Sequence, residues 1–257
     1  MNGEMHQICR IATAAKAALR GRTALSFELS KYENSIWFQF LPLESILEDQ
    51  AKKAVCASVW FERCKERDLV DIAILVPDVV QDLNLLGYSN MTRSILVCYF
   101  ADRPTIFFSP YWSFDTSIQA WDILYTEHEW HNATTVKPQF SNPRESFLAV
   151  LLQIKMFAEE IGHPNFASLF QKAADILCGT INMDSVEYPP LLPALPDENQ
   201  RLFLAASTAD VFGGMGSWND DPACSAHLKG FDQTYHRLSQ ELFQQTRYAA
   251  MYAINEW

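Results

Sequence analysis

The chain has 257 residues, of which 49% are hydrophobic and 20% charged, and its formal net charge is −11. This composition is typical of a globular protein long enough for two packed subdomains, and it excludes an intrinsically disordered chain. No run of 18 apolar residues is present, so we expect no membrane-spanning helix. The acidic balance also disfavours binding to nucleic acid, because the surface would repel phosphates.

In the first half of the chain, the residue pattern predicts a mixture of helices and strands. In chain order we expect a helix over 5–20, strands over 23–29 and 35–41, a helix over 43–67, short apolar runs at 69–76 and 79–86, and a hairpin of 94–100 with 105–109. In the strand 35–41, Ile36, Phe38 and Phe40 alternate with Ser35, Trp37 and Gln39.

The second half predicts helices only. We expect helices over 144–161 and 165–178, a proline-rich connector over 184–196, a helix over 198–212, and one or two helices within 225–254. Gly162 and Gly179 should end the first two helices. The predicted fold class is therefore α+β, mainly α, with a small antiparallel sheet in a mixed region 1–140 and an all-helical domain 141–257.

Compartment and cofactors follow from the cysteines and the N-terminus. The N-terminal 20 residues lack the apolar segment and cleavage site of a secretory signal. The six cysteines are scattered and form no C-x-x-C pair, which predicts reduced thiols, with neither a disulfide framework nor a zinc site. We therefore expect a cytoplasmic protein without a cofactor.

The most specific feature of the sequence is a glycine-rich corner. It places three glycines within four positions between two predicted helices, and its residues are Phe212, Gly213, Gly214, Met215, Gly216, Ser217, Trp218, Asn219 and Asp220. One interpretation is a turn between helices with three large side chains packed beneath it. A second is a nest of backbone N–H groups that holds an anion, although no P-loop lysine is present. A third is a recognition loop in which Trp218 is the hot spot.

Two further clusters have a functional and a structural interpretation. Glu127–His131 contains His128 and His131, which are weak candidates for metal ligands in a segment that could equally be an exposed polar connection. The aromatic side chains of a second cluster either form a protein-binding patch or belong to a strand that feeds the core. They are Phe107, Phe108, Tyr111, Trp112 and Phe114.

The last 100 or so residues carry a resemblance. The turn at Ile161–Pro164, a further helix and then the sequence F-G-G-M-G-S-W-N-D at 212–220 resemble an uncharacterised bacterial helical domain family with an F-G-G-M-G-S-x-N-D signature. That family is loosely associated with toxin-immunity proteins. This chain differs from the short members of that family by its proline-rich connector over 184–196, which separates the first two helices from the helix that precedes the glycines. The resemblance implies a bacterial cytoplasmic protein and transfers no catalytic residue.

The function expected from these observations is non-enzymatic binding of a protein partner. The acidic balance suits a basic partner, since charge complementarity speeds association, although it would also serve solubility alone. We expect an immunity protein that covers the active site of a basic toxin, without binding nucleic acid or membrane. The alternatives are a metal-dependent enzyme that uses the cluster at 127–131, and a structural subunit of a larger complex.

Overall fold

The computed structural model describes residues 3–21, 23–41, 53–76, 94–130, 138–181, 195–213 and 215–257. The chain divides into two compact units. The sheet unit comprises Gln7–Leu75 and Arg93–Pro138, and the helical unit comprises Met1–His6, Val76–Thr92 and Gln139–Trp257.

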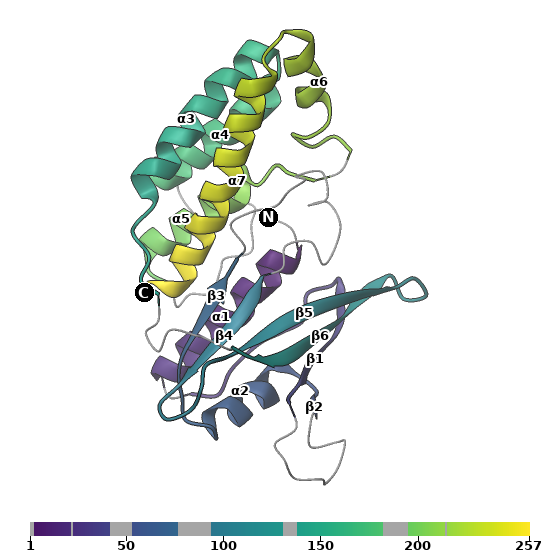
Figure 1. Cartoon of the computed structure of the whole chain (residues 1–257), viewed down its shortest axis with the longest axis vertical. Helices are drawn as coiled ribbons and strands as arrows, with labels where there is room; N and C mark the ends of the chain where they lie inside the picture. The colour runs from purple at the N-terminus through teal and green to yellow at the C-terminus, as the bar shows by residue number, and fades with distance from the viewer. Residues whose placement is uncertain are drawn as a thin grey trace. The chain divides into compact units, whose positions relative to one another are not determined.

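Among its described residues, the sheet unit contains two helices and one six-stranded sheet (Figure 1). Its elements are α1 (Gly3–Gly21, whose first residues belong to the helical unit), β1 (Glu33–Gln39), β2 (Lys53–Ala54), α2 (Ala57–Lys65), β3 (Leu69–Leu75), β4 (Ile95–Phe100), β5 (Ile106–Asp115) and β6 (Ala120–Glu129). The strands lie in the order β2-β1-β6-β5-β4-β3. All neighbours are antiparallel except β1 and β6, which run parallel.

The predicted fold class, mainly α with a small antiparallel sheet, is therefore wrong. The sheet is mixed, and its strands continue through the middle of the chain as far as Glu129. The error has two physical sources. The alternation in β6 is masked by charged residues near its end, and the parallel pairing of β1 with β6 joins segments too far apart for any local pattern to reveal.

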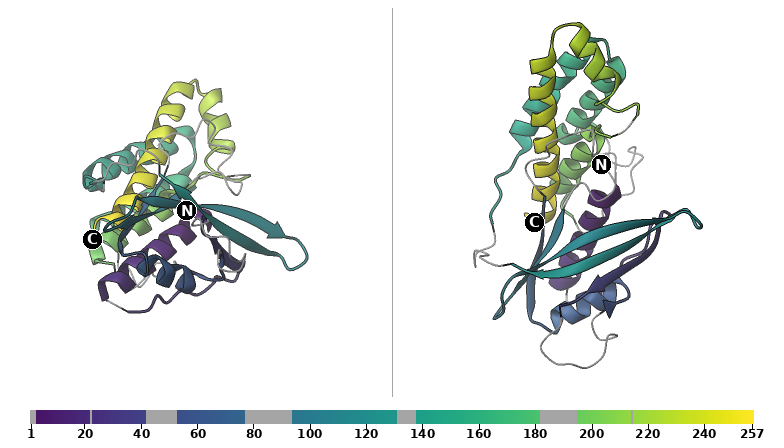
Figure 2. Two further views of the ribbon diagram at one scale, coloured as in Figure 1. Left: turned by 60° about the horizontal axis from the view of Figure 1, so that its bottom comes forward. Right: turned by 45° about the vertical axis from the view of Figure 1, so that its right-hand side comes forward.

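One face of the sheet is covered by α1 and α2, which lie on the same side of it in both views of Figure 2. Strand residues at alternate positions point to this face. Phe38 of β1 stacks on Trp60 of α2 at 4.7 Å between ring centroids, and on Tyr125 of β6 at 4.9 Å. Tyr125 in turn donates its hydroxyl hydrogen to Gln7 Oε1 of α1 at 2.8 Å. These buried rings form the core of the sheet unit.

The continuous helix predicted over 43–67 is also wrong. Lys53 and Ala54 form the short strand β2 opposite Gln39 and Phe38, and the helix begins only at Ala57. Residues 42–52, 77–93 and 182–194 lie outside the described part of the chain, and these ranges include the apolar run 79–86 and most of the predicted connector. The hairpin of 94–100 with 105–109 is confirmed, since β4 pairs antiparallel with β5.

From Arg144 onward, the described part of the helical unit contains helices joined by turns and irregular connections, without a strand. They are α3 (Arg144–Ile161), α4 (Pro164–Cys178), α5 (Asp197–Ala209), α6 (Asp221–Leu228) and α7 (Asp232–Asn255). The predicted helices over 144–161 and 165–178 are confirmed as α3 and α4, and α5 is buried from Leu202 to Ala209. No described helix is both long and apolar enough to span a membrane.

Gly162 ends α3 as predicted, with a φ of 90° in the left-handed region. We expect Gly162→Ala to lower the free energy of unfolding by about 1–2 kcal/mol, because a Cβ disfavours this conformation. Steric contact adds little, since the nearest atom to the new Cβ is Lys229 Nζ at 3.9 Å. Gly21→Ala is the matched control, because Gly21 ends α1 without a positive φ. Urea unfolding of both variants measures the difference, and equal stabilities would contradict the argument.

Candidate protein-binding surface

The structure places Trp218 of the glycine-rich corner in the core of the helical unit. The side chain is fully buried, and its ring lies 5.3 Å from the ring of Phe170 and 5.7 Å from that of Tyr235. The indole Nε1 donates a hydrogen bond to Ser239 Oγ at 2.8 Å, and the Tyr235 hydroxyl donates to the Trp218 carbonyl at 2.8 Å. Burial raises the pKa of Tyr235 to about 12. Trp218 therefore cannot contact a partner in this arrangement.

The rest of the corner is a hydrogen-bonded turn. Gly216 has a φ of 79° and donates its N–H to Asp220 Oδ2 at 2.9 Å, and Ser217 donates its hydroxyl hydrogen to the Gly213 carbonyl at 3.0 Å. Phe212 packs edge-on against Phe243, and Asn219 also reaches the Gly213 carbonyl. Met215 is 99% exposed, so it does not pack beneath the turn as we expected. Gly214 lies outside the described residues.

The cluster Glu127–His131 begins on strand β6 and therefore points to alternate faces of the sheet. Glu127 lies on the covered face, where both its oxygens accept hydrogen bonds from Arg67 at 3.0 Å. Burial raises the pKa of Glu127, and the Arg67 charge partly offsets this. His128 lies on the opposite face, hydrogen-bonded to Ser109 at 2.8 Å. His131 is outside the described residues, and among those described no three metal-ligating side chains converge.

The aromatic cluster of strand β5 is also divided between the two faces. Phe108 and Trp112 point to the covered face and are buried. Tyr111 points to the other face and is 61% exposed, whereas Phe107 stacks on His128 at 4.9 Å. Phe114, near the hairpin turn, is partly exposed. The cluster is thus neither wholly core nor wholly surface.

On the face opposite α1 and α2, the strands β1, β6 and β5 carry a row of three large side chains, of which sequence reasoning singled out only Tyr111 as a binding candidate. Trp37 of β1 lies opposite Leu124 of β6, and Leu124 lies opposite Tyr111 of β5. Neighbouring strands are about 4.8 Å apart, so the three side chains span roughly 10 Å across the sheet. Trp37 is 39% exposed, which is unusual for so large an apolar side chain. We name Trp37, Leu124 and Tyr111 the aromatic row.

Polar side chains lie on either side of the aromatic row. On one side, Ser35 and Ser113 flank Asp122, and on the other Gln39 and Ser109 flank Thr126. An apolar centre with a polar rim is the usual arrangement of a protein interface. The alternation of strand 35–41 carried the signal for this surface, because it placed Trp37 among polar residues rather than among those of the core.

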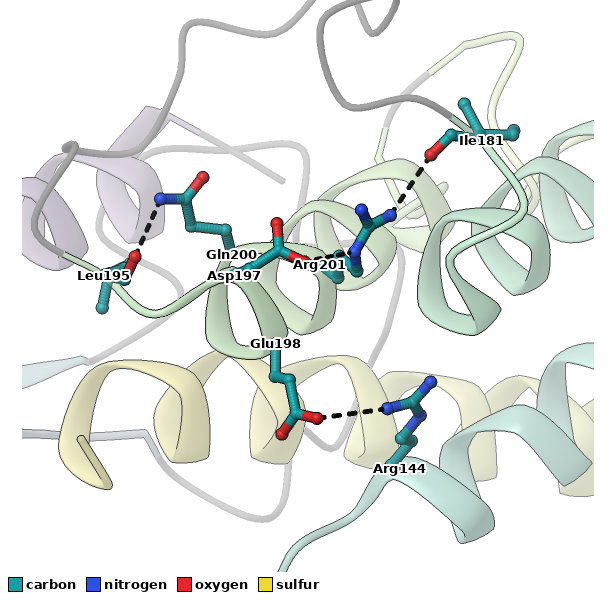
Figure 3. Close-up of polar contacts among 7 residues, drawn as sticks. All are labelled: Arg144, Ile181, Leu195, Asp197, Glu198, Gln200 and Arg201. Carbon is teal, nitrogen blue, oxygen red and sulfur yellow. Dashed lines mark hydrogen bonds and ion pairs between the residues drawn. The ribbon is translucent and has the colours of Figure 1, made fainter.

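The described part of the helical unit carries exposed negative charge. Its basic side chains are largely neutralised by acidic neighbours, as at the start of α5, where Arg201 pairs with Asp197 at 2.8 Å and Arg144 with Glu198 at 4.0 Å (Figure 3). Exposed carboxylates remain without a described ion-pair partner. They include Glu145, Glu160 and Asp221. The excess negative charge of this half of the chain is therefore exposed to solvent.

Comparisons of the chain with models of protein families, with curated proteins and with solved structures gave no match.

Proposed function

We propose that the chain is a non-enzymatic protein-binding protein, most concretely a bacterial cytoplasmic immunity protein that covers the active site of a basic toxin. The aromatic row is the observation that carries this proposal. Tryptophan and tyrosine dominate binding energy at protein interfaces, and both are exposed here on a sheet face with a polar rim. The net charge of −11 supports a basic partner, which it would attract and orient.

The position of the row on a sheet suits a binding surface. Strand pairing fixes the spacing of Trp37, Leu124 and Tyr111, so little conformational freedom is lost when a partner binds. The glycine-rich corner, which the sequence made the leading candidate, supports the proposal less, because its tryptophan is buried.

The test is affinity capture of the tagged protein from its native cells, followed by mass spectrometry. We expect one basic protein at near one-to-one stoichiometry, toxic when expressed alone and harmless when co-expressed with this chain. The double variant Trp37→Ala/Tyr111→Ala should weaken binding by about 30-fold or more, since each residue is a candidate hot spot.

Tyr32→Ala is the matched control. Tyr32 is 61% exposed, as Tyr111 is, but it precedes β1 and lies outside the aromatic row. Its replacement should leave capture unchanged. If the double variant recovers the same partner with wild-type affinity, the aromatic row is not the binding surface. If the captured protein is not toxic when expressed alone, the immunity assignment is wrong.

A further inference from the structure

We propose that Trp37 and Asp122 together form a receptor for an arginine side chain of the partner. This inference rests on the proposed function and specifies the chemistry of the contact. Hydrogen bonds within the sheet unit hold an exposed indole ring beside a carboxylate.

A chain of hydrogen bonds fixes the position of the Trp37 indole. Trp37 Nε1 donates a hydrogen bond to Ser35 Oγ at 3.0 Å, and Ser35 donates its hydroxyl hydrogen to Asp122 Oδ1. Ser35 and Trp37 are two residues apart on β1, so their side chains share the face opposite α1 and α2. The indole therefore leans along the strand toward Ser35. Its orientation is fixed before any partner arrives, although the side chain is 39% exposed.

Asp122 can accept more hydrogen bonds than the described residues donate to it. Its Oδ1 accepts hydrogen bonds from Asn34 Nδ2, at 2.8 Å, and from Ser35. An ionised carboxylate has two oxygens and about four acceptor sites. No hydrogen bond reaches Oδ2 from the part of the chain that the structure describes, so this oxygen is available to a donor from outside. The indole nitrogen and the carboxylate share one hydroxyl group, which keeps them within two hydrogen-bond lengths of each other.

Among the described residues, no basic side chain competes for the Trp37 ring or the Asp122 carboxylate. Other aromatic rings already hold a basic side chain of this chain, as Arg67 lies over Phe40 at 4.7 Å and Arg10 over Phe27 at 4.8 Å. In the described ranges, neither Trp37 nor Asp122 has such a neighbour. Within these ranges, no basic side chain therefore occupies the position over the ring and beside the carboxylate, to which a cation would be attracted.

Arginine fits this pair better than lysine does. A guanidinium is planar, so it can stack on the indole face and direct N–H donors from its edge toward Asp122 Oδ2 at the same time. An ammonium group is a compact, strongly hydrated charge and would have to give up one of these contacts. Tyr111, two strands away, then contacts an apolar residue of the partner that lies beside that arginine.

The experiment uses the full chain labelled with ¹⁵N and the probe N-acetyl-arginine methylamide. The chain has seven tryptophans, so seven indole N–H signals are expected, and Trp37→Phe identifies the one from Trp37. Titration with the probe should shift this signal to saturation. The citrulline analogue has nearly the same shape without the charge, and it should cause no saturable shift.

Asp122→Asn is the discriminating variant, because its carbonyl oxygen can still accept from Asn34 and Ser35. We expect affinity for the arginine probe to fall about fivefold or more, since a charge-assisted hydrogen bond is lost at an exposed site. Equal shifts with citrulline, no shift at all, or an unchanged affinity in the Asn variant would each overturn the proposal.

The two proposals can fail separately. If capture of a basic toxin requires Trp37 and Tyr111 but the arginine probe does not bind, the proposed function stands and the arginine receptor is wrong. If the probe binds as expected and no basic protein is captured from the native cells, the receptor stands and the immunity function is wrong.

Discussion

Replacing Trp218 with alanine is expected to lower the free energy of unfolding by about 3–5 kcal/mol, the usual cost of removing a large buried aromatic side chain. The indole is fully buried, and the rings of Phe166, Phe170 and Tyr235 surround it at centroid distances of 5.3–5.7 Å. Truncation leaves a cavity among these rings and removes the donor to Ser239. Urea unfolding followed by circular dichroism measures the loss.

Two variants test this explanation. Met215→Ala lies in the same corner but changes a side chain that is 99% exposed, so stability should change by less than about 0.5 kcal/mol. Trp218→Phe keeps most of the ring volume but loses the N–H donor and part of the fused ring, so its cost should lie between the other two. A Trp218→Ala protein as stable as Met215→Ala would mean that the corner is not anchored by this ring.

The helices α3 and α4 could be predicted from sequence because their signals are local. Apolar spacing and the terminal glycines Gly162 and Gly179 gave the bounds of α3 and α4 to within one residue. One of the three interpretations of the corner, with Trp218 in the core beneath a turn, could also be made from sequence, because turn-forming residues surround it. The exposure of Met215 could not be predicted, since it depends on which way the backbone turns at Gly216.

The sheet could be predicted only in part. Strand β6 was missed because Glu127 and His128 suggested an exposed polar segment, whereas Glu127 is buried against Arg67, 60 residues earlier in the chain. A buried carboxylate with a distant partner leaves no local pattern. The aromatic row as a whole was missed for the same reason, although Tyr111 alone was singled out. Trp37, Leu124 and Tyr111 become neighbours only through strand pairing, and no single segment contains more than one of them.

Replacing Asp210 with asparagine is expected to be about as costly as truncating Trp218, at about 3–5 kcal/mol, because it leaves a buried cation without its counter-charge. Asp210 Oδ1 lies 2.8 Å from Arg247, and the two side chains are only 3% and 5% exposed. Arg247 also lies over the Phe243 ring at 4.4 Å. Asp197→Asn is the control, since Asp197 pairs with Arg201 at the same 2.8 Å but is 69% exposed, and it should cost less than about 1 kcal/mol.

The Asp210–Arg247 pair predicts that the free energy of unfolding depends on pH. Burial is the largest single influence and would raise the pKa of Asp210, but the opposing interactions, led by the Arg247 charge, together outweigh it, so the pKa is lowered from its ordinary value of 3.8. The folded state then binds fewer protons than the unfolded state in this range. The stabilisation is therefore present above pH 3.8 and is lost as the pH falls through the lowered pKa. Urea unfolding of wild type and Asp210→Asn between pH 2 and pH 7 should show the two stabilities converging in acid. Parallel curves would show that the carboxylate does not stabilise the fold through its charge.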